Sequence, residues 1–319
     1  MSSAQGERMK KQIVVIMLGL SFVGGIFTST VSAQNSIISN INRGVDAVTG
    51  GTQAPAATTP MPSQTTTTPS NNGSGGTYAA LGDSVAAGLG LPPVANATAQ
   101  DTQCGRSSQA YPYMVAQQRQ LRLIHVACSG ATIGDLVTNQ GVSGPNLQPQ
   151  LDAAYANGTP QLITITAGAN DVHWTDFLRL CYSFNCATTI NSTVARGYTL
   201  VAGAKLDYAF QDIANRSNGH PPTVIITGYY NPVSNYCSGR QSNVTADEIN
   251  WLNTQRDALN KTIRDTAARY SFVKYASADF TGHGLCSSDP WTQGLNDPAP
   301  LHPTAAGQAQ IAQSILGTL

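Results

Sequence analysis

The sequence predicts an α/β domain over residues 77–319, in which helices cover both faces of a parallel sheet. Short apolar runs, rich in β-branched or aromatic residues, recur along this part of the chain, and each is too short for a helix. Segments with helical periodicity lie between these runs. Because strands that alternate with helices form parallel sheets buried on both faces, the pattern favours a single layered domain.

The predicted strands and helices follow from the residue pattern. Strands are expected at residues 78–81, 121–126, 162–166, 224–227 and 272–275. The clearest helix begins at Thr245, because Glu248, three residues later, completes a capping box and an apolar stripe follows. Two further helices are predicted at residues 198–213 and 303–316, and the second opens on a proline in its first turn.

Residues 1–33 contain, in the same order, the three regions of a secretory signal peptide. Basic residues precede an apolar run from Ile13 to Phe27, and small residues follow up to Ala33. A membrane anchor, the alternative, would need about 20 apolar residues. This run is shorter and is interrupted by glycines. We therefore expect cleavage after Ala33, export of the mature chain, and no stable membrane insertion after cleavage.

Residues 34–76 are predicted to be a linker in front of the domain. From position 50 onward the linker consists mainly of Thr, Pro, Ser and Gly, a composition that cannot bury an apolar core. Residues 34–49 are too short to form a domain of their own.

The charge pattern indicates no nucleic-acid partner. Without residues 1–33, which hold three basic residues and one acidic residue, 14 basic and 16 acidic residues remain. The resulting formal charge of −2 does not indicate a basic surface that would bind a polyanion or an acidic membrane. Only 11% of residues are charged, so solubility depends largely on Asn, Gln, Ser and Thr.

All six cysteines lie in the part of the chain that we expect to be exported. An even number after a signal peptide predicts disulfide bonds, although spacing alone does not define the pairs. A zinc site is not predicted, because no Cys-x-x-Cys pair and no histidine at ligand spacing beside one is present. A catalytic thiol is not expected either, because an oxidising compartment would consume it.

Four residues that can take part in chemistry lie next to predicted strands or helices. Ser84 follows the first strand, Gly130 the second and Asn170 the third, and His302 precedes the last helix. In open α/β sheets, ligands bind outside the carboxyl ends of the strands. We therefore expect these four residues to meet at one edge of the sheet.

This set of residues suits acyl transfer. A serine hydroxyl becomes a good nucleophile when a base takes its proton, and histidine titrates near the working pH. Ser84 is therefore the predicted nucleophile and His302 its general base. The Ser84 N–H, the Gly130 N–H and the Asn170 side-chain amide are the predicted donors to the oxyanion of a tetrahedral intermediate.

The same residues resemble the sequence blocks of the SGNH (GDSL) hydrolase family. Residues 82–84 (Gly-Asp-Ser) resemble the GDSL block, Gly130 the glycine of the second block, residues 168–171 (Gly-Ala-Asn-Asp) the Gly-x-Asn-Asp block, and His302 the last histidine. Each motif alone is common, and all four in order are specific. The resemblance covers residues 77–319. It implies the flavodoxin-like SGNH hydrolase fold, a three-layer α/β/α sandwich with a roughly five-stranded parallel sheet. It also implies ester hydrolysis without a cofactor or metal.

The chain also resembles the secreted actinobacterial lipases and esterases of this family. The similarity lies in residues 104–107 (Cys-Gly-Arg-Ser), which are followed by Tyr-Pro at 111–112. That branch carries three disulfide bonds between cysteines that are neighbours in sequence. The resemblance therefore implies the pairs Cys104–Cys128, Cys181–Cys186 and Cys237–Cys286.

One position departs from the family pattern. Many members place an aspartate three residues before the catalytic histidine to orient its ring, whereas this chain has Ala299 there. Asp297 is one candidate for the orienting group, and the backbone carbonyl near Ala299 is the other. We favour the carbonyl, which fixes the tautomer of His302 but stabilises its charged form less than a carboxylate would.

Structural roles are the alternative explanation for these residues. Ser84 is also a favourable helix N-cap, and Asn170 also suits a turn. Asp83 is expected to bond local backbone rather than to take part in chemistry. His283 is the alternative base, and His173 is a candidate to line the pocket.

The leading hypothesis is a secreted, monomeric carboxylic-ester hydrolase, an esterase or lipase that acts on a small-molecule, lipid or sugar ester. The alternative from another class is a cell-surface carbohydrate- or lipid-binding module that kept the fold and lost turnover. A phospholipase or thioesterase using the same residues is a third hypothesis. Hydrolysis of p-nitrophenyl acetate that disappears in the variant Ser84→Ala would separate an enzyme from a binding module.

Overall fold

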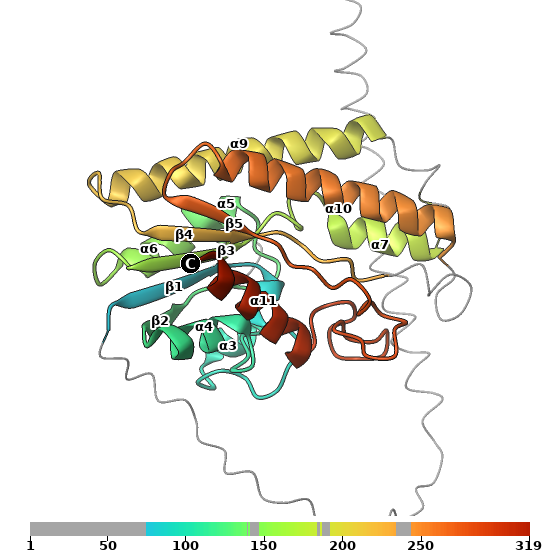
Figure 1. Cartoon of the computed structure of the whole chain (residues 1–319), viewed down its shortest axis with the longest axis horizontal. Coiled ribbons are helices and arrows are strands. Elements are labelled where there is room, and N and C mark those ends of the chain that lie inside the picture. Colours follow the sequence, from blue (N-terminus) through green and yellow to red (C-terminus); the bar gives the residue numbers. More distant parts are fainter. Residues whose placement is uncertain (1–74, 139, 141–146, 184–185, 187–191, 234–243) are drawn as a thin grey trace, which may run out of the picture. The chain divides into compact units, whose positions relative to one another are not determined.

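The centre of the fold is a five-stranded sheet in the order β2-β1-β3-β4-β5, in which every pair of neighbours is parallel (Figure 1). The computed structural model describes residues 75–138, 140, 147–183, 186, 192–233 and 244–319. The strands are β1 (Thr77–Gly82), β2 (Arg122–His125), β3 (Leu162–Thr166), β4 (Thr223–Thr227) and β5 (Val273–Ala276). Each of the five predicted strands is therefore present.

The central strand shows why such short apolar runs form strands here. All five residues of β3 are buried, because the strand has a neighbour on each side and helices over both faces. A parallel strand in this position is read as a continuous apolar or β-branched run rather than as an alternating pattern. The parallel α/β class predicted from the sequence is confirmed.

Four helices cover one face of the sheet and enclose the larger apolar core. This core includes Leu81, Ile163 and Ile226 from the sheet and Phe210 and Ile263 from the longest helices. Figure 1 shows the two long helices lying side by side across this face. The four helices are α5 (Gly134–Val137), α6 (Gln150–Tyr155), α9 (Ser192–Arg216) and α10 (Ala246–Ala267).

The second core lies on the opposite face, where Tyr78 and Ile225 from the sheet pack against Tyr111, Val115 and Ile311 from the helices. The helices that contribute to this core are α2 (Ser84–Ala87), α4 (Tyr111–Arg119) and α11 (Ala305–Thr318). The short helix α3 (Ala99–Cys104) adds Cys104 to a separate small cluster around Cys128. Because each face has its own helical layer and core, the domain is a three-layer α/β/α sandwich.

The observed helix ends agree with the predicted signals in one case and correct them in another. At α10, both hydrogen bonds of the capping box between Thr245 and Glu248 are present. The last helix does not open on Pro303 in its first turn. It begins at Ala305, because the Thr304 side chain accepts the Gly307 N–H and caps the helix.

A third apolar cluster lies outside the two sheet-facing cores. It includes Phe177 from α7 (Trp174–Ser183), Val244, and Ile249 and Leu252 from α10, with Leu301 packed against it. Leu301 immediately precedes His302. An apolar cluster therefore begins next to the predicted general base.

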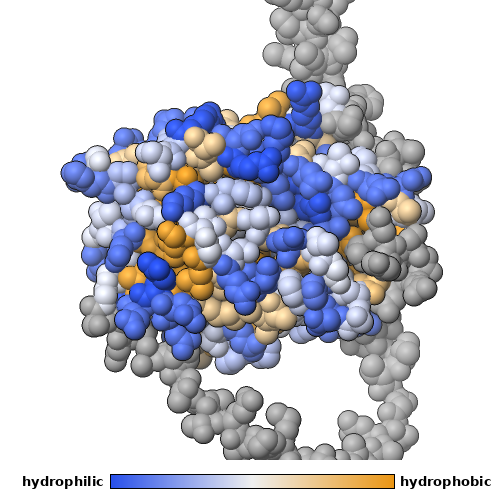
Figure 2. Space-filling model, viewed as in Figure 1, coloured by the Kyte–Doolittle hydropathy of each residue, from blue (hydrophilic) through white to orange (hydrophobic). Residues whose placement is uncertain are grey.

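The surface in Figure 2 is mostly hydrophilic, with apolar residues in small groups. In the described part of the chain, no helix combines the length and the apolar character that crossing a membrane requires. The predicted signal peptide and the linker up to position 74 lie outside the described residues.

Candidate active site

Ser84 lies at the point where β1 turns sharply into α2. Gly82 has φ +130°, and a Cβ at this position would collide with the Thr166 carbonyl oxygen, so the turn requires glycine. Asp83 then caps α2, because its Oδ1 accepts the Val85 N–H at 2.9 Å. The turn places Ser84 as the first residue of the helix, at the carboxyl end of the strand.

The side chains of Ser84 and His302 are hydrogen-bonded to each other. The His302 Nε2 lies 2.8 Å from the Ser84 Oγ, although the two residues are 218 positions apart. The other ring nitrogen, Nδ1, lies 3.2 Å from the Pro300 carbonyl oxygen. Because a carbonyl only accepts, Nδ1 carries the proton and Nε2 presents its lone pair to the serine hydroxyl. This is the tautomer that a general base needs.

The environment of His302 favours its neutral form. Burial lowers the pKa of His302 below its ordinary value of 6.5, and hydrogen bonds to the Pro300 and Ala299 carbonyls partly offset this effect. A neutral imidazole is the form that accepts a proton, so the ring is a base across the neutral pH range.

The group next to the His302 Nδ1 is a backbone carbonyl and not the Asp297 carboxylate. The acceptor for Nδ1 is the carbonyl of Pro300, one residue after Ala299. The Ala299 carbonyl accepts the backbone N–H of His302 at 3.1 Å. The exposed Asp297 accepts the Gly294 N–H at 2.6 Å. The Asp297 carboxylate thus stabilises the turn of residues 294–297. A backbone carbonyl near Ala299, that of Pro300, contacts the ring of His302 instead.

Replacing Asp297 by Ala is expected to keep most of kcat in ester hydrolysis, because the Pro300 carbonyl remains in place to hold the tautomer of His302. The turn at Gly294 loses one hydrogen bond, so a small decrease in thermal stability is expected. Steady-state kinetics of the purified variant measure the effect. A loss of more than about 100-fold in kcat would assign the orienting role to the carboxylate.

The loop that carries His302 is held from two sides. The Tyr230 hydroxyl donates to the Leu301 carbonyl at 2.9 Å, and Leu301 itself adopts φ +67°, a conformation rare for a branched side chain. The buried Gln293 side chain donates to the carbonyls of Leu89, at 2.8 Å, and Pro303, at 3.2 Å. Gln293 therefore joins the segment after α2 to the segment after His302.

A second buried glutamine ties the helix of Ser84 to the last helix. Gln308 is fully buried on α11, where its amide donates to the Val85 carbonyl at 2.9 Å and accepts the Tyr111 N–H at 2.8 Å. Sequence reasoning missed both Gln293 and Gln308. The available signal was weak, since a glutamine in a loop or helix is most often exposed.

The predicted oxyanion donors come from three neighbouring turns. Gly130 has φ +84°, and the Asn170 Nδ2 donates one hydrogen to the Ala131 carbonyl at 2.8 Å. The second hydrogen of that amide is left for another acceptor. Among the described residues, neither the Ser84 N–H nor the Gly130 N–H is hydrogen-bonded to another residue. Backbone donors of this kind can bind developing negative charge.

The turn of Gly130 is anchored by a disulfide bond. Cys104 and Cys128 are bonded, with their Cα atoms 4.3 Å apart, and the Ser129 N–H donates to the Cys104 carbonyl at 3.0 Å. The buried Arg106 side chain donates to the Ala127 carbonyl at 2.7 Å. These bonds fix the backbone directly before Gly130.

A second disulfide bond joins Cys181, in α7, to Cys186. The third predicted pair includes Cys237, which lies outside the described residues. Thus the two predicted pairs whose cysteines are all described are present.

The remaining candidate histidines have other partners. His283 contacts Asp289 through Nδ1, and its ring stacks on Trp291 at 3.6 Å between centroids. His173 is exposed, with its Nδ1 3.3 Å from Asp176. His302, and not His283, is the histidine that is hydrogen-bonded to Ser84 in the described part of the chain.

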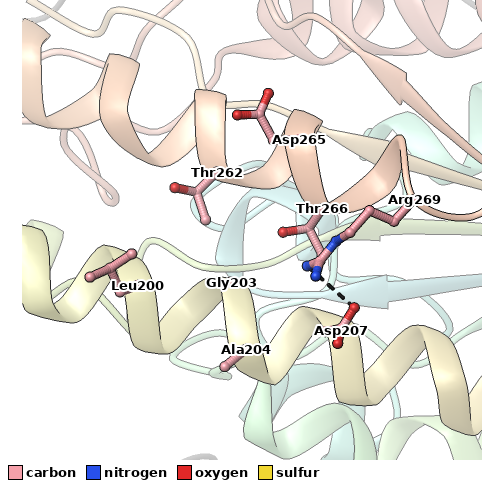
Figure 3. A pocket seen from close by; sticks show the side chains of 8 residues that line it. All are labelled: Leu200, Gly203, Ala204, Asp207, Thr262, Asp265, Thr266 and Arg269. Carbon is pink, nitrogen blue, oxygen red and sulfur yellow. Dashed lines mark ion pairs between the residues drawn. The ribbon is translucent and has the colours of Figure 1, made fainter.

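A separate hollow of about 510 Å³ lies between α9 and α10 (Figure 3). It contains the ion pair of Arg269 with Asp207 at 3.2 Å, and none of the predicted catalytic or oxyanion residues lines it. In the part of the chain that the structure describes, no three His, Cys, Asp or Glu side chains are grouped so that they could hold a metal ion. The side chains of Ser84 and His302, in contrast, lie within hydrogen-bond reach of each other, which is the pairing that activates a serine hydroxyl.

Comparison with known proteins agrees with this site. Residues 80–310 match the GDSL-like lipase/acylhydrolase family. Lipase 1 of Streptomyces coelicolor is 30% identical over 243 residues, which cover 73% of this chain and 82% of the relative. A lipase of Streptomyces rimosus is 29% identical over 241 residues, with the same two coverages of 73% and 82%.

Two solved structures share the fold. The extracellular lipase of Streptomyces rimosus superposes with a TM-score of 0.62 at 25% identity, covering 77% of this chain and 100% of that protein. Phospholipase A1 of Streptomyces albidoflavus NA297 superposes with a TM-score of 0.62 at 26% identity, covering 76% of this chain and 99% of that protein.

Proposed function

The chain belongs to the GDSL-like lipase/acylhydrolase family, and from this premise we propose that it hydrolyses carboxylic esters through an acyl-enzyme on Ser84, with His302 as general base. That it is an ester hydrolase of the SGNH group follows from the family and from its lipase relatives. The assignment of roles to individual residues is our proposal.

The observation that carries the proposal is the hydrogen bond of 2.8 Å between the Ser84 Oγ and the His302 Nε2. A nucleophile and a base within hydrogen-bond reach, with the base oriented by a third group, are the signature of an activated serine. The Pro300 carbonyl supplies the third group. A helix N-cap or a surface histidine would not need this pairing.

In the acylation step, His302 Nε2 takes the Ser84 hydroxyl proton while Oγ forms a bond to the ester carbonyl carbon. The carbonyl oxygen becomes an oxyanion, which the N–H groups of Ser84 and Gly130 and the amide of Asn170 stabilise. The imidazolium then donates its proton to the leaving alkoxide as the carbon–oxygen bond breaks. An alcohol leaves, and the acyl group remains on Ser84.

In the deacylation step, water replaces the alcohol. His302 takes one proton from the water, whose oxygen attacks the acyl carbon, and the same donors bind the second oxyanion. The imidazolium returns the proton to the Ser84 Oγ as the acyl–oxygen bond breaks. The carboxylic acid leaves, and the free enzyme is restored without any cofactor.

We further propose that the enzyme is secreted and that the acyl part of its substrate is apolar. The signal-peptide pattern of residues 1–33 supports export, and the Streptomyces rimosus relative is an extracellular lipase. Leu301, which precedes His302, packs with the partly buried Trp174 and Leu178 against an apolar cluster, and these side chains support an acyl chain on that side. Lipid esters are the substrates that this combination favours.

The test is a series of p-nitrophenyl esters from acetate to palmitate, measured with the purified mature chain. We expect hydrolysis, with kcat/KM rising from acetate to medium-length chains, because each buried methylene contributes about 0.8 kcal/mol of binding. A maximum at acetate would instead indicate a small acyl group, as on an acetylated sugar. Absence of hydrolysis across the whole series would overturn the proposal in favour of a binding module.

A further inference from the structure

The Tyr229 hydroxyl joins the turn of Ser84 to the turn of Asn170. It donates to the Asp83 Oδ2 at 2.5 Å and accepts the Ala169 N–H at 3.0 Å. Asp83 immediately precedes Ser84, and Ala169 immediately precedes Asn170. One hydroxyl group is therefore hydrogen-bonded to the residue directly before Ser84 and to the residue directly before Asn170. Ser84 and Asn170 both supply oxyanion donors in the proposed reaction.

These hydrogen bonds converge on the Asp83 carboxylate. The Ala169 N–H donates to Tyr229, Tyr229 donates to the Asp83 Oδ2, and the Asp83 Oδ1 accepts the Val85 N–H. Burial, and then the negative charge of Asp83, raise the pKa of Tyr229, so the phenol keeps the proton that it donates. A phenylalanine at this position would remove the partner of both Asp83 Oδ2 and the Ala169 N–H.

The position of Tyr229 is itself fixed from α10. Its N–H donates to the Asn260 Oδ1 at 2.7 Å, and the Asn260 Nδ2 donates to the Tyr229 carbonyl at 2.8 Å. Tyr229 follows β4, which neighbours β3, and β3 neighbours β1. The side chain thus extends from the end of β4 past β3 to the turn that follows β1.

The opposite side of the Asn170 turn is tied to the turn of Gly130. The Asn170 Nδ2 donates to the Ala131 carbonyl, and the buried Asp171 accepts the Ile133 N–H at 2.8 Å. The Asn170 turn is therefore bonded to the second strand end on one side and, through Tyr229, to the first strand end on the other.

We propose that Tyr229 is a positioning residue, which holds the donors of Ser84 and Asn170 at the separation that one oxyanion requires. The inference rests on the function proposed above. Tyr229 acts through Asp83 and Ala169 rather than on the reacting atoms. Because both donors must reach the same oxygen, a displacement of about 1 Å lowers the rate by about 100-fold in sites of this kind.

The test is the variant Tyr229→Phe, which keeps the ring and removes the hydroxyl. We expect kcat for a p-nitrophenyl ester to fall by about 30-fold, less than the roughly 100-fold or greater effect of losing a donor outright or of a displacement of about 1 Å, because both donors remain and shift only in part. KM should change by less than about threefold. The inhibition constant of an alkylboronic acid, which forms a tetrahedral adduct on the serine, should rise by a similar factor. A role in stability alone would lower the melting temperature and leave boronate binding by the folded enzyme unchanged.

The matched control is Tyr270→Phe. The Tyr270 hydroxyl also donates to an aspartate, Asp207, at 2.7 Å. Tyr270 precedes β5 and so lies near the amino ends of the parallel strands, whereas Tyr229 lies at their carboxyl ends. This variant loses the same kind of hydrogen bond far from Ser84. We expect its kcat, KM and boronate inhibition to match those of the wild type.

A kcat and a boronate inhibition constant for Tyr229→Phe within about threefold of wild type would overturn the inference. If that variant does not fold, Asn260→Ala decides, because it removes the two bonds that place Tyr229 and leaves the hydroxyl present. A fall in its kcat at constant KM supports the inference, and an unchanged kcat refutes it. Failure of the proposed function would look different, since the wild type would then hydrolyse no ester or Ser84→Ala would remain active.

Discussion

Replacing Ser84 by Ala is expected to lower kcat for ester hydrolysis by about 10⁴- to 10⁶-fold. The reason is that Ala removes the Oγ that lies 2.8 Å from the His302 Nε2, so no acyl-enzyme can form. Residual catalysis would come from the backbone donors and from binding alone. Release of p-nitrophenol from a medium-chain ester, followed at high enzyme concentration, measures the loss.

Two measurements make this result specific. A fluorophosphonate, which reacts with activated serines, should label the wild type and leave Ser84→Ala unlabelled. Ser288→Ala, which alters an exposed serine in a loop, should retain wild-type activity and labelling. Labelling of Ser84→Ala at full rate would place the nucleophile elsewhere and contradict the assignment.

Replacing His302 by Ala is the second large effect, with an expected loss in kcat of about 10⁴-fold or more. Without the imidazole, the Ser84 hydroxyl keeps its proton, and the leaving alkoxide has no donor. The double variant Ser84→Ala/His302→Ala should be about as slow as the slower single variant, because the two side chains act as one unit. Losses that multiply would show that the two residues act independently, and this would contradict the proposed dyad.

The pH dependence reports on the same group. A base must be neutral, so kcat/KM should rise with pH through the pKa of His302 and stay level above it. Because burial lowers that pKa below 6.5, the activity should be retained to more acidic pH than for an exposed histidine. If kcat/KM rises with a midpoint above pH 7 once other titrating groups are accounted for, the result would contradict the lowered pKa of His302.

The carboxyl group of Asp83 also titrates and needs its own control. Burial raises the pKa of Asp83 to about 7, against the hydrogen bonds from Tyr229 and Val85, which lower it. The carboxylate form is the one that accepts the Tyr229 proton, so protonation of Asp83 below pH 7 weakens that contact. Measuring the pH profile in Asp83→Asn removes this titration and leaves the limb of His302 alone.

The strands and the predicted site residues were accessible from the sequence because each is encoded locally. A buried parallel strand needs only a short run of apolar or β-branched residues, as in residues 162–166, and a capping box needs only Thr245 and Glu248. The expected convergence of Ser84 and His302 also followed, because the carboxyl ends of parallel strands share one edge. Strand order and the first residue of the last helix were less accessible, since they depend on packing and on one cap at Thr304.

The sequence by itself determined the parallel α/β class and the identity of the residues that take part in the proposed chemistry. The tertiary structure alone decided which groups hold those residues in place. The Tyr229–Asp83 bond spans 146 positions and the Gln293–Leu89 bond spans 204, and the acceptor for His302 is the carbonyl of Pro300. Such contacts join groups that are far apart in the sequence and approach each other only after the layers have packed. No local residue spacing therefore predicts them. Strands and caps arise from neighbours along the chain, whereas the support of an active site arises from neighbours in space.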